Sequence, residues 1–294
     1  STAAALREHG WRLGLAGGLQ RAPLKVAESA TELGAQDLVV VAVKGPAMAS
    51  VARGIGPLLG EHTMVLTAMN GVPWWFFEGF GGAHEGMRLQ AVDPEGAIAA
   101  AIPARHVIGS VVHATCSTPE PGLVKHGFGH GLILGEPAGG TSARLQSLVE
   151  ALAQAGFELK ASDAIQREIW YKLWGNMTMN PVSAITGATC DRILDDELVR
   201  GFVLRVMDEA KAIGARIGCP IEQSGEDRNA VTRKLGAFKT SMLQDVEAGR
   251  SIELDALVTV VREIGQKLDV PTPAIDALLG LTRLAAQTRG LYPI

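Results

Sequence analysis

Two short apolar runs rich in β-branched residues stand at the ends of residues 37–71, DLVVVAVKGPAMASVARGIGPLLGEHTMVLTAMNG. Such runs are typical of strands that are buried in a parallel sheet. Between them Pro46 opens a helical stretch that reaches about Leu59, and proline is well tolerated at a helix start. The order strand, helix, strand predicts a βαβ unit, whose crossover is right-handed in a parallel sheet.

The predicted sheet continues on the C-terminal side of this unit. HVIGSVVHATC (106–116) predicts a further strand, and LVKHGFGHGLILGE (123–136) predicts an antiparallel addition with glycine-rich turns. SARLQSLVEALAQAG (142–156) predicts a helix that Gly156 closes. The first half of the chain is therefore expected to form an α/β domain.

On the N-terminal side, glycines 14, 17 and 18 lie close together. No long apolar strand precedes them and no clear helix follows, so they do not match the G-x-G-x-x-G loop that marks a dinucleotide site. They predict a turn between two strands, RLGL (12–15) and APLKV (22–26).

From about residue 164 onward the periodicity is helical and no strand is predicted. Gly218, Gly249 and the Pro271/Pro273 pair separate the helices. The helices are expected at 164–180, 193–217, roughly 223–248, 252–268 and 272–288. The sequence thus predicts an α/β domain followed by an all-α domain, with the boundary near residues 158–164. WWFFEGFGGAHEG (74–86) is aromatic and glycine-rich, and it predicts a loop that is either a lid or an apolar patch.

The composition excludes several classes of protein. A hydrophobic fraction of 47% and a charged fraction of 20% indicate a chain with a sizeable core, and the net charge of −4 does not favour nucleic-acid binding. No apolar run is long enough for a bilayer span, and the first residues do not resemble a signal peptide. Three widely spaced cysteines favour a reducing cytoplasm, and without C-x-x-C pairs no metal site is expected.

Polar residues interrupt an apolar helix in EIWYKLWGNMTMNPVSAITG, residues 168–187. Lys172, Asn176 and Asn180 are spaced by four, so they form one ridge roughly 12 Å long on a helix whose other faces carry tryptophan, leucine and methionine. A buried amide without partners costs about 1–3 kcal/mol, so two of them need a reason. The alternative is a solvated face, although asparagine is a poor residue inside a helix. Pro181 should end the helix or force a local adjustment.

Other polar residues stand where a parallel sheet binds its ligands. Lys44 and Asn70 follow the two strands of residues 37–71, at the carboxyl ends beyond which such sheets bind ligands. The alternative is that Lys44 ends a strand and Asn70 belongs to a simple turn.

A third group lies in TSMLQDVEAGRSIELDALV, residues 240–258, where Ser241, Asp245 and Glu253 are candidates for a site. Gly249 should separate two helices, and Ser251 is a plausible N-cap for the second. An alternative explanation for Glu253 is that an acid in a first helical turn suits the helix dipole.

Together these segments resemble the ketopantoate reductase (2-dehydropantoate 2-reductase) family. The similarity rests on VAVKGPA, AMNG, EIWYKLWGNMTMNPVSAITG and SMLQDVEAGRSIELD, which occur in order over almost the whole chain. It implies a Rossmann-type dinucleotide-binding domain at 1–161 and a helical substrate and dimerisation domain at 162–294. The independent boundary near residue 160 agrees with this division.

The resemblance also implies roles for the substrate-side residues. Lys172 matches the catalytic lysine that donates a proton, and Asn176 and Asn180 match amides that hold the substrate's hydroxyl and carboxylate end. Ser241 matches a further substrate contact.

On the cofactor side, Glu253 matches the acid that engages the nicotinamide ribose and helps to place the catalytic lysine. Asn70 matches an asparagine where cofactor and substrate meet, Lys44 a cofactor-side lysine, and Thr115 a backbone contact to the cofactor.

The chain departs from the family pattern in three places. The family's first strand and glycine-rich phosphate loop, on the order of 30 residues, have no counterpart before Ser1. Either the sequence is not the full polypeptide or it is a remnant; because a sheet without that central strand would expose a wide apolar edge, we expect the native protein to have it. Cys190 or a neighbour stands where some members have another substrate-side asparagine, and the 74–104 region is longer and more aromatic.

The expected activity is NADPH-dependent reduction of a 2-oxo acid, 2-dehydropantoate to pantoate or a close analogue, in a cleft between the domains, with Lys172 as proton donor. This activity would belong to pantothenate biosynthesis. One alternative is a truncated, non-catalytic binding protein, and another is a related dehydrogenase that acts on a different 2-oxo or 3-hydroxy acid. A homodimer is compatible with each of these functions.

Overall fold

The structure, a computed structural model, describes residues 1–294, and their contacts divide the chain into two compact units. Unit 1 contains a sheet and unit 2 is mainly helical. Unit 1 consists of Ser1–Val43, Ala47–Met69 and Ala100–Ile165, and unit 2 of Lys44–Pro46, Asn70–Ala99 and Gln166–Ile294. The three-residue segment Lys44–Pro46 and the longer segment Asn70–Ala99, which both follow predicted strands, therefore belong to the helical unit.

The sheet of unit 1 has seven strands, six of which follow one another in the order β2-β1-β6-β5-β4-β3, while β7 pairs with β6. Their bounds are β1 (Trp11–Leu15), β2 (Gly18–Ala22), β3 (Gln36–Val41), β4 (Leu59–Thr67), β5 (Val107–Glu120), β6 (Leu123–Gly135) and β7 (Glu158–Ser162). β3, β4 and β5 are parallel, and β6 is antiparallel to β5, as the sequence predicts.

Strand β7 is absent from the sequence-based prediction. It pairs in parallel with the last residues of β6, with Leu132 opposite Leu159 and Gly135 opposite Ser162. Its sequence ELKAS contains few apolar residues, and most of its side chains are exposed. A weakly apolar edge strand of this kind leaves little periodic signal.

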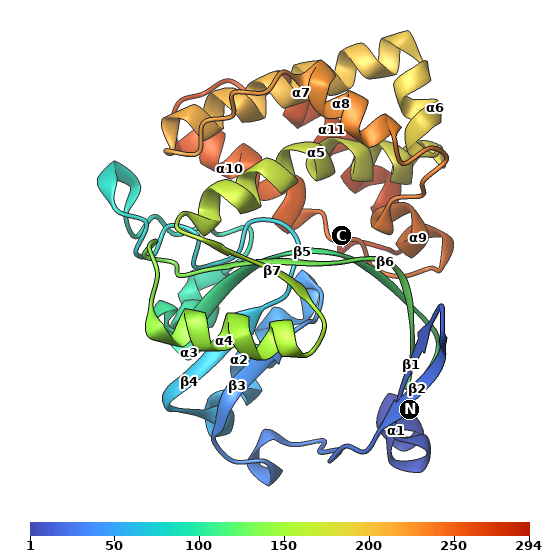
Figure 1. The fold of residues 1–294 in the computed structure, drawn as a ribbon. Coiled ribbons are helices and arrows are strands. Elements are labelled where there is room, and N and C mark those ends of the chain that lie inside the picture. Colours follow the sequence, from blue (N-terminus) through green and yellow to red (C-terminus); the bar gives the residue numbers. More distant parts are fainter. The chain divides into compact units, whose positions relative to one another are not determined.

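The N-terminal hairpin is confirmed, but its second strand is shifted. β1 pairs antiparallel with β2, and Leu15 lies opposite Gly18, so the turn contains only Ala16 and Gly17. The strand predicted at 22–26 instead ends at Ala22, because this tight turn begins the return strand earlier. Helix α1 (Thr2–His9) precedes the hairpin, and Figure 1 shows both at the far end of the long strands β5 and β6.

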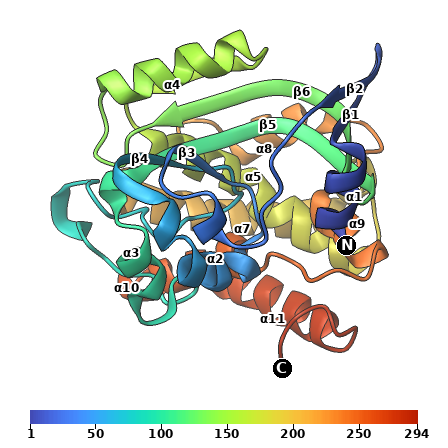
Figure 2. The ribbon, with the colours of Figure 1, turned by 90° about the horizontal axis from the view of Figure 1, so that it is seen from below.

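The core of unit 1 lies between the sheet and α4 (Ala143–Gln154), which runs along one face while α2 (Met48–Gly54) lies on the other (Figure 2). Ser142 caps α4 by accepting a hydrogen bond from the N–H of Leu145. The buried side chains of this core are Leu66, Ile108, Leu132, Leu134, Leu145 and Leu148.

Unit 2 is built from helices around α5. Their bounds are α5 (Ile165–Thr186), α6 (Cys190–Asp195), α7 (Glu197–Arg216), α8 (Gly225–Arg233), α9 (Ser241–Glu247), α10 (Val260–Lys267) and α11 (Pro273–Gln287), and α3 (Ala97–Ala101) begins at the end of the 70–99 segment. α5 continues through Pro181 instead of stopping there. None of the helices has the combination of length and apolar character needed to cross a bilayer.

Three of the predicted helices are divided. The expected helix at 193–217 is interrupted at Asp196, between α6 and α7. The expected helix at 223–248 is broken into α8 and α9, and the expected helix at 252–268 begins as a π-helical turn, Asp255–Thr259, before α10. Leu254 precedes this turn and no side chain caps it, so the predicted N-cap role of Ser251 is wrong.

The aromatic start of the 74–86 segment, residues 74–77, is part of the core of unit 2 and forms no exposed patch, whereas residues 79, 81–83, 85 and 86 are exposed. Trp74, Trp75, Phe76 and Phe77 are all buried, and the ring of Phe76 lies 6.1 Å from that of Trp170 on α5. Burial of each such ring stabilises the fold by several kcal/mol. This segment thus anchors the chain that follows Asn70 to α5.

We predict that Phe76→Ala lowers the free energy of unfolding by about 3–5 kcal/mol, since it leaves a cavity among the packed rings. Urea denaturation followed by tryptophan fluorescence measures the change. Phe128→Ala is the control, because that side chain is 75% exposed, and it should change the stability by less than about 0.5 kcal/mol. Equal stabilities of the two variants would contradict a core role for the aromatic segment.

Candidate functional site

The ammonium group of Lys172 is the centre of a polar cluster in unit 2. Lys172 lies on α5, and its Nζ donates a hydrogen bond to Oδ1 of Asn70 at 2.8 Å. The two residues are 102 positions apart in the sequence, yet both belong to unit 2. The structure therefore brings together two residues that the sequence predicts for one site.

The backbone after Asn70 is fixed by a close approach that only glycine permits. Gly71 has φ +85°, and a Cβ atom there would lie 2.3 Å from the carbonyl oxygen of Ala256. The same oxygen accepts a hydrogen bond from the N–H of Val72 at 2.9 Å. Because Ala256 lies in the π-helical turn, this turn fixes the position of Asn70.

Glu253 lies just before the π-helical turn, and not within a first helical turn as the dipole interpretation assumed. Its Oε1 accepts a hydrogen bond from the N–H of Gly45 at 3.1 Å. Burial raises the pKa of Glu253, whereas the Gly45 hydrogen bond and the charges of Lys44 and Lys172 act in the opposite direction.

The electrostatics of Lys172 combine two opposed effects. Burial lowers the pKa of Lys172 to about 8, and the negative charge of Glu253 partly offsets this by favouring the ammonium form. Burial is the larger effect. The ammonium thus titrates close to neutral pH, where a side chain is most effective as a general acid or base.

Lys44 forms an ion pair with Asp245 of α9, and the same carboxylate accepts a hydrogen bond from Nε of Arg250 at 3.0 Å. Asp245 is therefore a charged member of the cluster. The sequence indicated Asp245 as a candidate but gave it no specific role. The sequence feature that could have indicated its role is an acidic residue at an apolar position of a short amphipathic helix.

The remaining substrate-side candidates also lie in unit 2. Asn176 is partly buried and Asn180 is buried, both on the same helix as Lys172. Ser241 is exposed at the first residue of α9, where the hydroxyl of Thr240 accepts the capping hydrogen bond from Leu243 N–H. The Ser241 hydroxyl is therefore not used as the helix cap.

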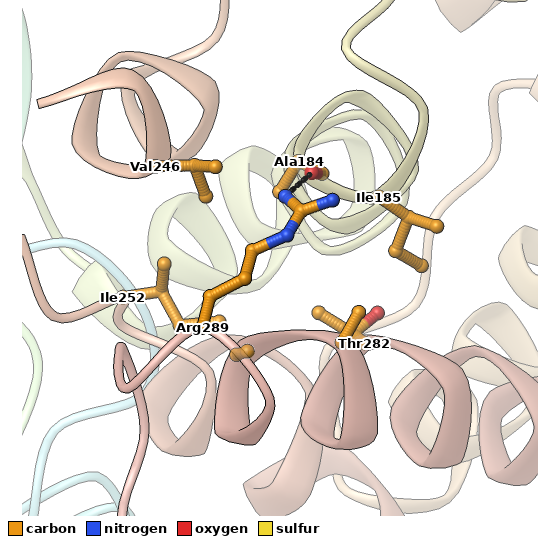
Figure 3. Close-up of a pocket in the computed structure, with 8 residues that line it drawn as sticks. Ala184, Ile185, Val246, Ile252, Thr282 and Arg289 are labelled. Atoms are coloured by element: carbon orange, nitrogen blue, oxygen red, sulfur yellow. Dashed lines mark hydrogen bonds between the residues drawn. The ribbon is translucent and has the colours of Figure 1, made fainter. Parts of the chain in front are cut away.

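A small pocket lies between three segments of unit 2: α5, residues 246–252 and α11. Figure 3 shows Ala184 and Ile185 from α5, Val246, which follows Asp245, and Ile252, which precedes Glu253. Arg289, just after α11, donates to the carbonyl oxygen of Ala184 at 3.4 Å. The pocket has a volume of about 10 Å³, enough for one water molecule, so the three segments are closely packed.

Thr115 is the exception among the predicted site residues, because it lies on β5 in unit 1. Its Oγ1 accepts a hydrogen bond from the N–H of Phe128 at 2.9 Å. The cofactor contact predicted for Thr115 stays a prediction.

The side chains of this cluster can bind an anionic oxygen and a carbonyl oxygen. Lys44 supplies a half-exposed ammonium that suits an anionic oxygen, and Asn70 supplies an amide next to the Lys172 ammonium. Lys44 and Asn70 follow strands β3 and β4 in the chain, and residues after parallel strands are the usual ones to bind a nucleotide in an α/β fold. No group of three or more His, Cys, Asp or Glu side chains is arranged to hold a metal ion.

Comparison with known proteins identifies the family. Residues 1–139 match the family described as "Ketopantoate reductase PanE/ApbA", and residues 164–286 match its C-terminal counterpart. The chain belongs to the ketopantoate reductase family. It is 46% identical over 288 residues to a 2-dehydropantoate 2-reductase of Mesorhizobium japonicum, covering 98% of this chain and 88% of that protein. Membership of the ketopantoate reductase family makes this protein an oxidoreductase with a nucleotide-binding fold.

Solved structures support the same fold. A Ralstonia solanacearum protein assigned to the ketopantoate reductases is 62% identical and superposes with a TM-score of 0.96, covering 99% of this chain and 89% of that one. The 2-dehydropantoate 2-reductase of Methylococcus capsulatus is 27% identical with a TM-score of 0.81, covering 98% of this chain and 88% of that one. The predicted fold class, a Rossmann-type α/β domain with a helical C-terminal domain, is confirmed.

We predict that Glu253→Gln moves the pKa of Lys172 further below 8, because the neutral amide no longer favours the ammonium form. A pH titration of the isotopically labelled lysine side chains by NMR measures this shift. Glu247→Gln removes a charge from an exposed ion pair with Lys239 and serves as the control. An unchanged pKa in Glu253→Gln would mean that Lys172 does not sense that carboxylate.

Proposed function

We propose that this protein reduces the ketone of 2-dehydropantoate, or of a closely related 2-oxo acid, to an alcohol with NADPH, and that Lys172 donates the proton. The proposal is carried by one observation. The ammonium of Lys172, largely withdrawn from solvent, is hydrogen-bonded to Asn70 at 2.8 Å in the field of Glu253, and burial lowers its pKa to about 8. The similarity to the Mesorhizobium japonicum enzyme, which is named for this reaction, supports the choice of substrate.

The chemistry requires a cation at the carbonyl oxygen. NADPH, when bound, supplies the hydride that adds to the carbonyl carbon. The electron pair of the C=O π bond then moves onto the oxygen, and the Lys172 ammonium stabilises this negative charge. An N–H bond of Lys172 breaks as the oxygen takes the proton, leaving the neutral amine and the alcohol.

Glu253 and Asn70 prepare Lys172 for this step. Burial alone disfavours the ammonium, and the charge of Glu253 keeps enough of it protonated for a pKa of about 8. Asn70 accepts one of the three ammonium hydrogens and so directs the others. At pH 7 most of the lysine therefore carries the proton that it must give away.

The other predicted residues complete the site in this proposal. The amides of Asn176 and Asn180 hold the hydroxyl and carboxylate end of the acid, and the exposed hydroxyl of Ser241 adds a further hydrogen bond. Lys44 and Thr115 contribute to binding of the dinucleotide.

We predict that Lys172→Ala lowers kcat by about 10²–10⁴-fold for reduction of 2-dehydropantoate, the usual contribution of a general acid, while NADPH binding is retained. The decrease of NADPH absorbance gives the rate, and quenching of tryptophan fluorescence gives the binding. Lys239→Ala, at an exposed lysine paired with Glu247, should behave like the unaltered protein. A normal rate for Lys172→Ala would exclude Lys172 as the proton donor.

We predict that the rate of reduction falls as the pH rises through about 8, because deprotonation of Lys172 removes the proton to be donated. The sign follows from the mechanism, since the active form is the ammonium and its fraction decreases above its pKa. A profile of kcat against pH between 6 and 10 tests this. In Glu253→Gln the same fall should begin at a lower pH, and a profile that rises with pH would contradict the assignment.

A further inference from the structure

Two carboxylates of unit 2 hold two consecutive residues of the short segment Lys44–Pro46. Glu253 accepts a hydrogen bond from the backbone N–H of Gly45, and Asp245 forms an ion pair with the ammonium of Lys44. The proposed mechanism uses Glu253 but leaves Asp245 without a task. Because Asp245 has no role in that mechanism, its contacts indicate what it holds in place.

The side chain of Asp245 is enclosed by its neighbours. Its side chain is only 6% exposed, and its neighbours Met242 and Leu243 on α9 are buried. Val246, the next residue, lies in the wall of the small pocket in Figure 3, opposite α5 and α11. The carboxylate thus has little freedom to move, and it can fix the side chains that it binds.

Asp245 lies among charges of both signs. Its carboxylate binds two cations, Lys44 and Arg250, so these three side chains carry a net charge of +1, and the Glu253 carboxylate also interacts with Lys44 and Asp245. Lys44 is 44% exposed, and its ammonium has three hydrogens, of which the ion pair does not use all. Lys44 can therefore bind an anionic oxygen while Asp245 still holds it.

We infer that Asp245 is a positioning residue that fixes the ammonium of Lys44 for an oxyanion of the bound dinucleotide. This inference rests on the proposed function, because it takes NADPH to be the cofactor. Asp245 touches neither substrate nor cofactor and acts only through Lys44. Arg250 shares the carboxylate, so that the charge of Asp245 does not neutralise Lys44.

A double-mutant cycle separates this role from a merely structural one. We predict that Lys44→Met and Asp245→Asn each raise the Kd for NADPH by roughly tenfold, the loss of one charged contact, with a much smaller change in kcat. The double variant should bind NADPH no more than about twofold more weakly than Lys44→Met alone. Tryptophan fluorescence gives the Kd without turnover.

Two results would overturn the inference. If the two single effects multiply in the double variant, Asp245 does not act through Lys44. If the Kd for NADPH is unchanged while the KM for the 2-oxo acid rises in both single variants, the oxyanion is the substrate's carboxylate and not part of the dinucleotide.

The controls address folding and long-range charge. Glu247→Gln, on the same helix, removes an equal charge from an exposed ion pair and should leave the Kd unchanged. If thermal denaturation shows that Asp245→Asn folds poorly, Asp245→Glu tests the same contact, because it keeps the charge but displaces it by one methylene. Asp245→Glu should weaken NADPH binding when Lys44 is present. It should have no effect on NADPH binding when it is combined with Lys44→Met.

A measurement without ligand separates this inference from the proposed function. In Asp245→Asn the amide hydrogens of Lys44 and Gly45 should exchange at least several-fold faster, and slow exchange as in the unaltered protein would contradict positioning. If the unaltered protein does not bind NADPH, the proposed function fails, and so does the assignment of the oxyanion to the dinucleotide. Amide hydrogen exchange then still decides whether Asp245 fixes Lys44.

Discussion

The burial of one ammonium group is the constraint on which the rest of this structure depends. Lys172 loses much of its hydration inside unit 2, so its positive charge must be supported by the protein. Asn70 supplies a direct hydrogen bond and Glu253 a negative charge. Each of these partners must itself be held, because a displacement of about 1 Å would weaken both effects.

The surrounding structure shows how the partners are held. The Ala256 carbonyl in the π-helical turn fixes the chain directly after Asn70, and the buried aromatic side chains that follow pack against α5, the helix that carries Lys172. A π-helical turn interrupts the regular hydrogen bonding of a helix, and such turns often occur at functional sites. Here it begins two residues after Glu253, so one irregular segment positions both residues that support the ammonium.

The sequence predicted those parts of the fold in which local pattern and tertiary packing agree. The strands around residues 37–71 are strongly apolar, and they form the parallel pair that the pattern indicates. Strand β7 was missed because its edge position demands few apolar residues. Pro181 was expected to disturb or end its helix, but the packing of α5 keeps it helical to Thr186 and outweighs the local preference.

The site was predicted in part for similar reasons. The sequence indicates that Lys172, Asn176 and Asn180 share one face of a helix, because residues spaced by four lie above one another on a helix. The contact of Lys172 with Asn70 spans 102 positions and follows from no local pattern, and only the family resemblance pointed to it. The partners of Asp245 depend on tertiary structure in the same way, and so does the burial of the aromatic residues 74–77.

The segment composition of the two units has a consequence for the chain as a whole. The backbone passes from one unit to the other after Val43, Pro46, Met69, Ala99 and Ile165, so neither unit is a single continuous stretch. No single proteolytic cut yields two complete halves: a fragment starting near residue 166 would lack the aromatic residues that pack on α5 and the asparagine that meets its lysine. An exchange of halves between relatives must therefore keep the segments of both units together.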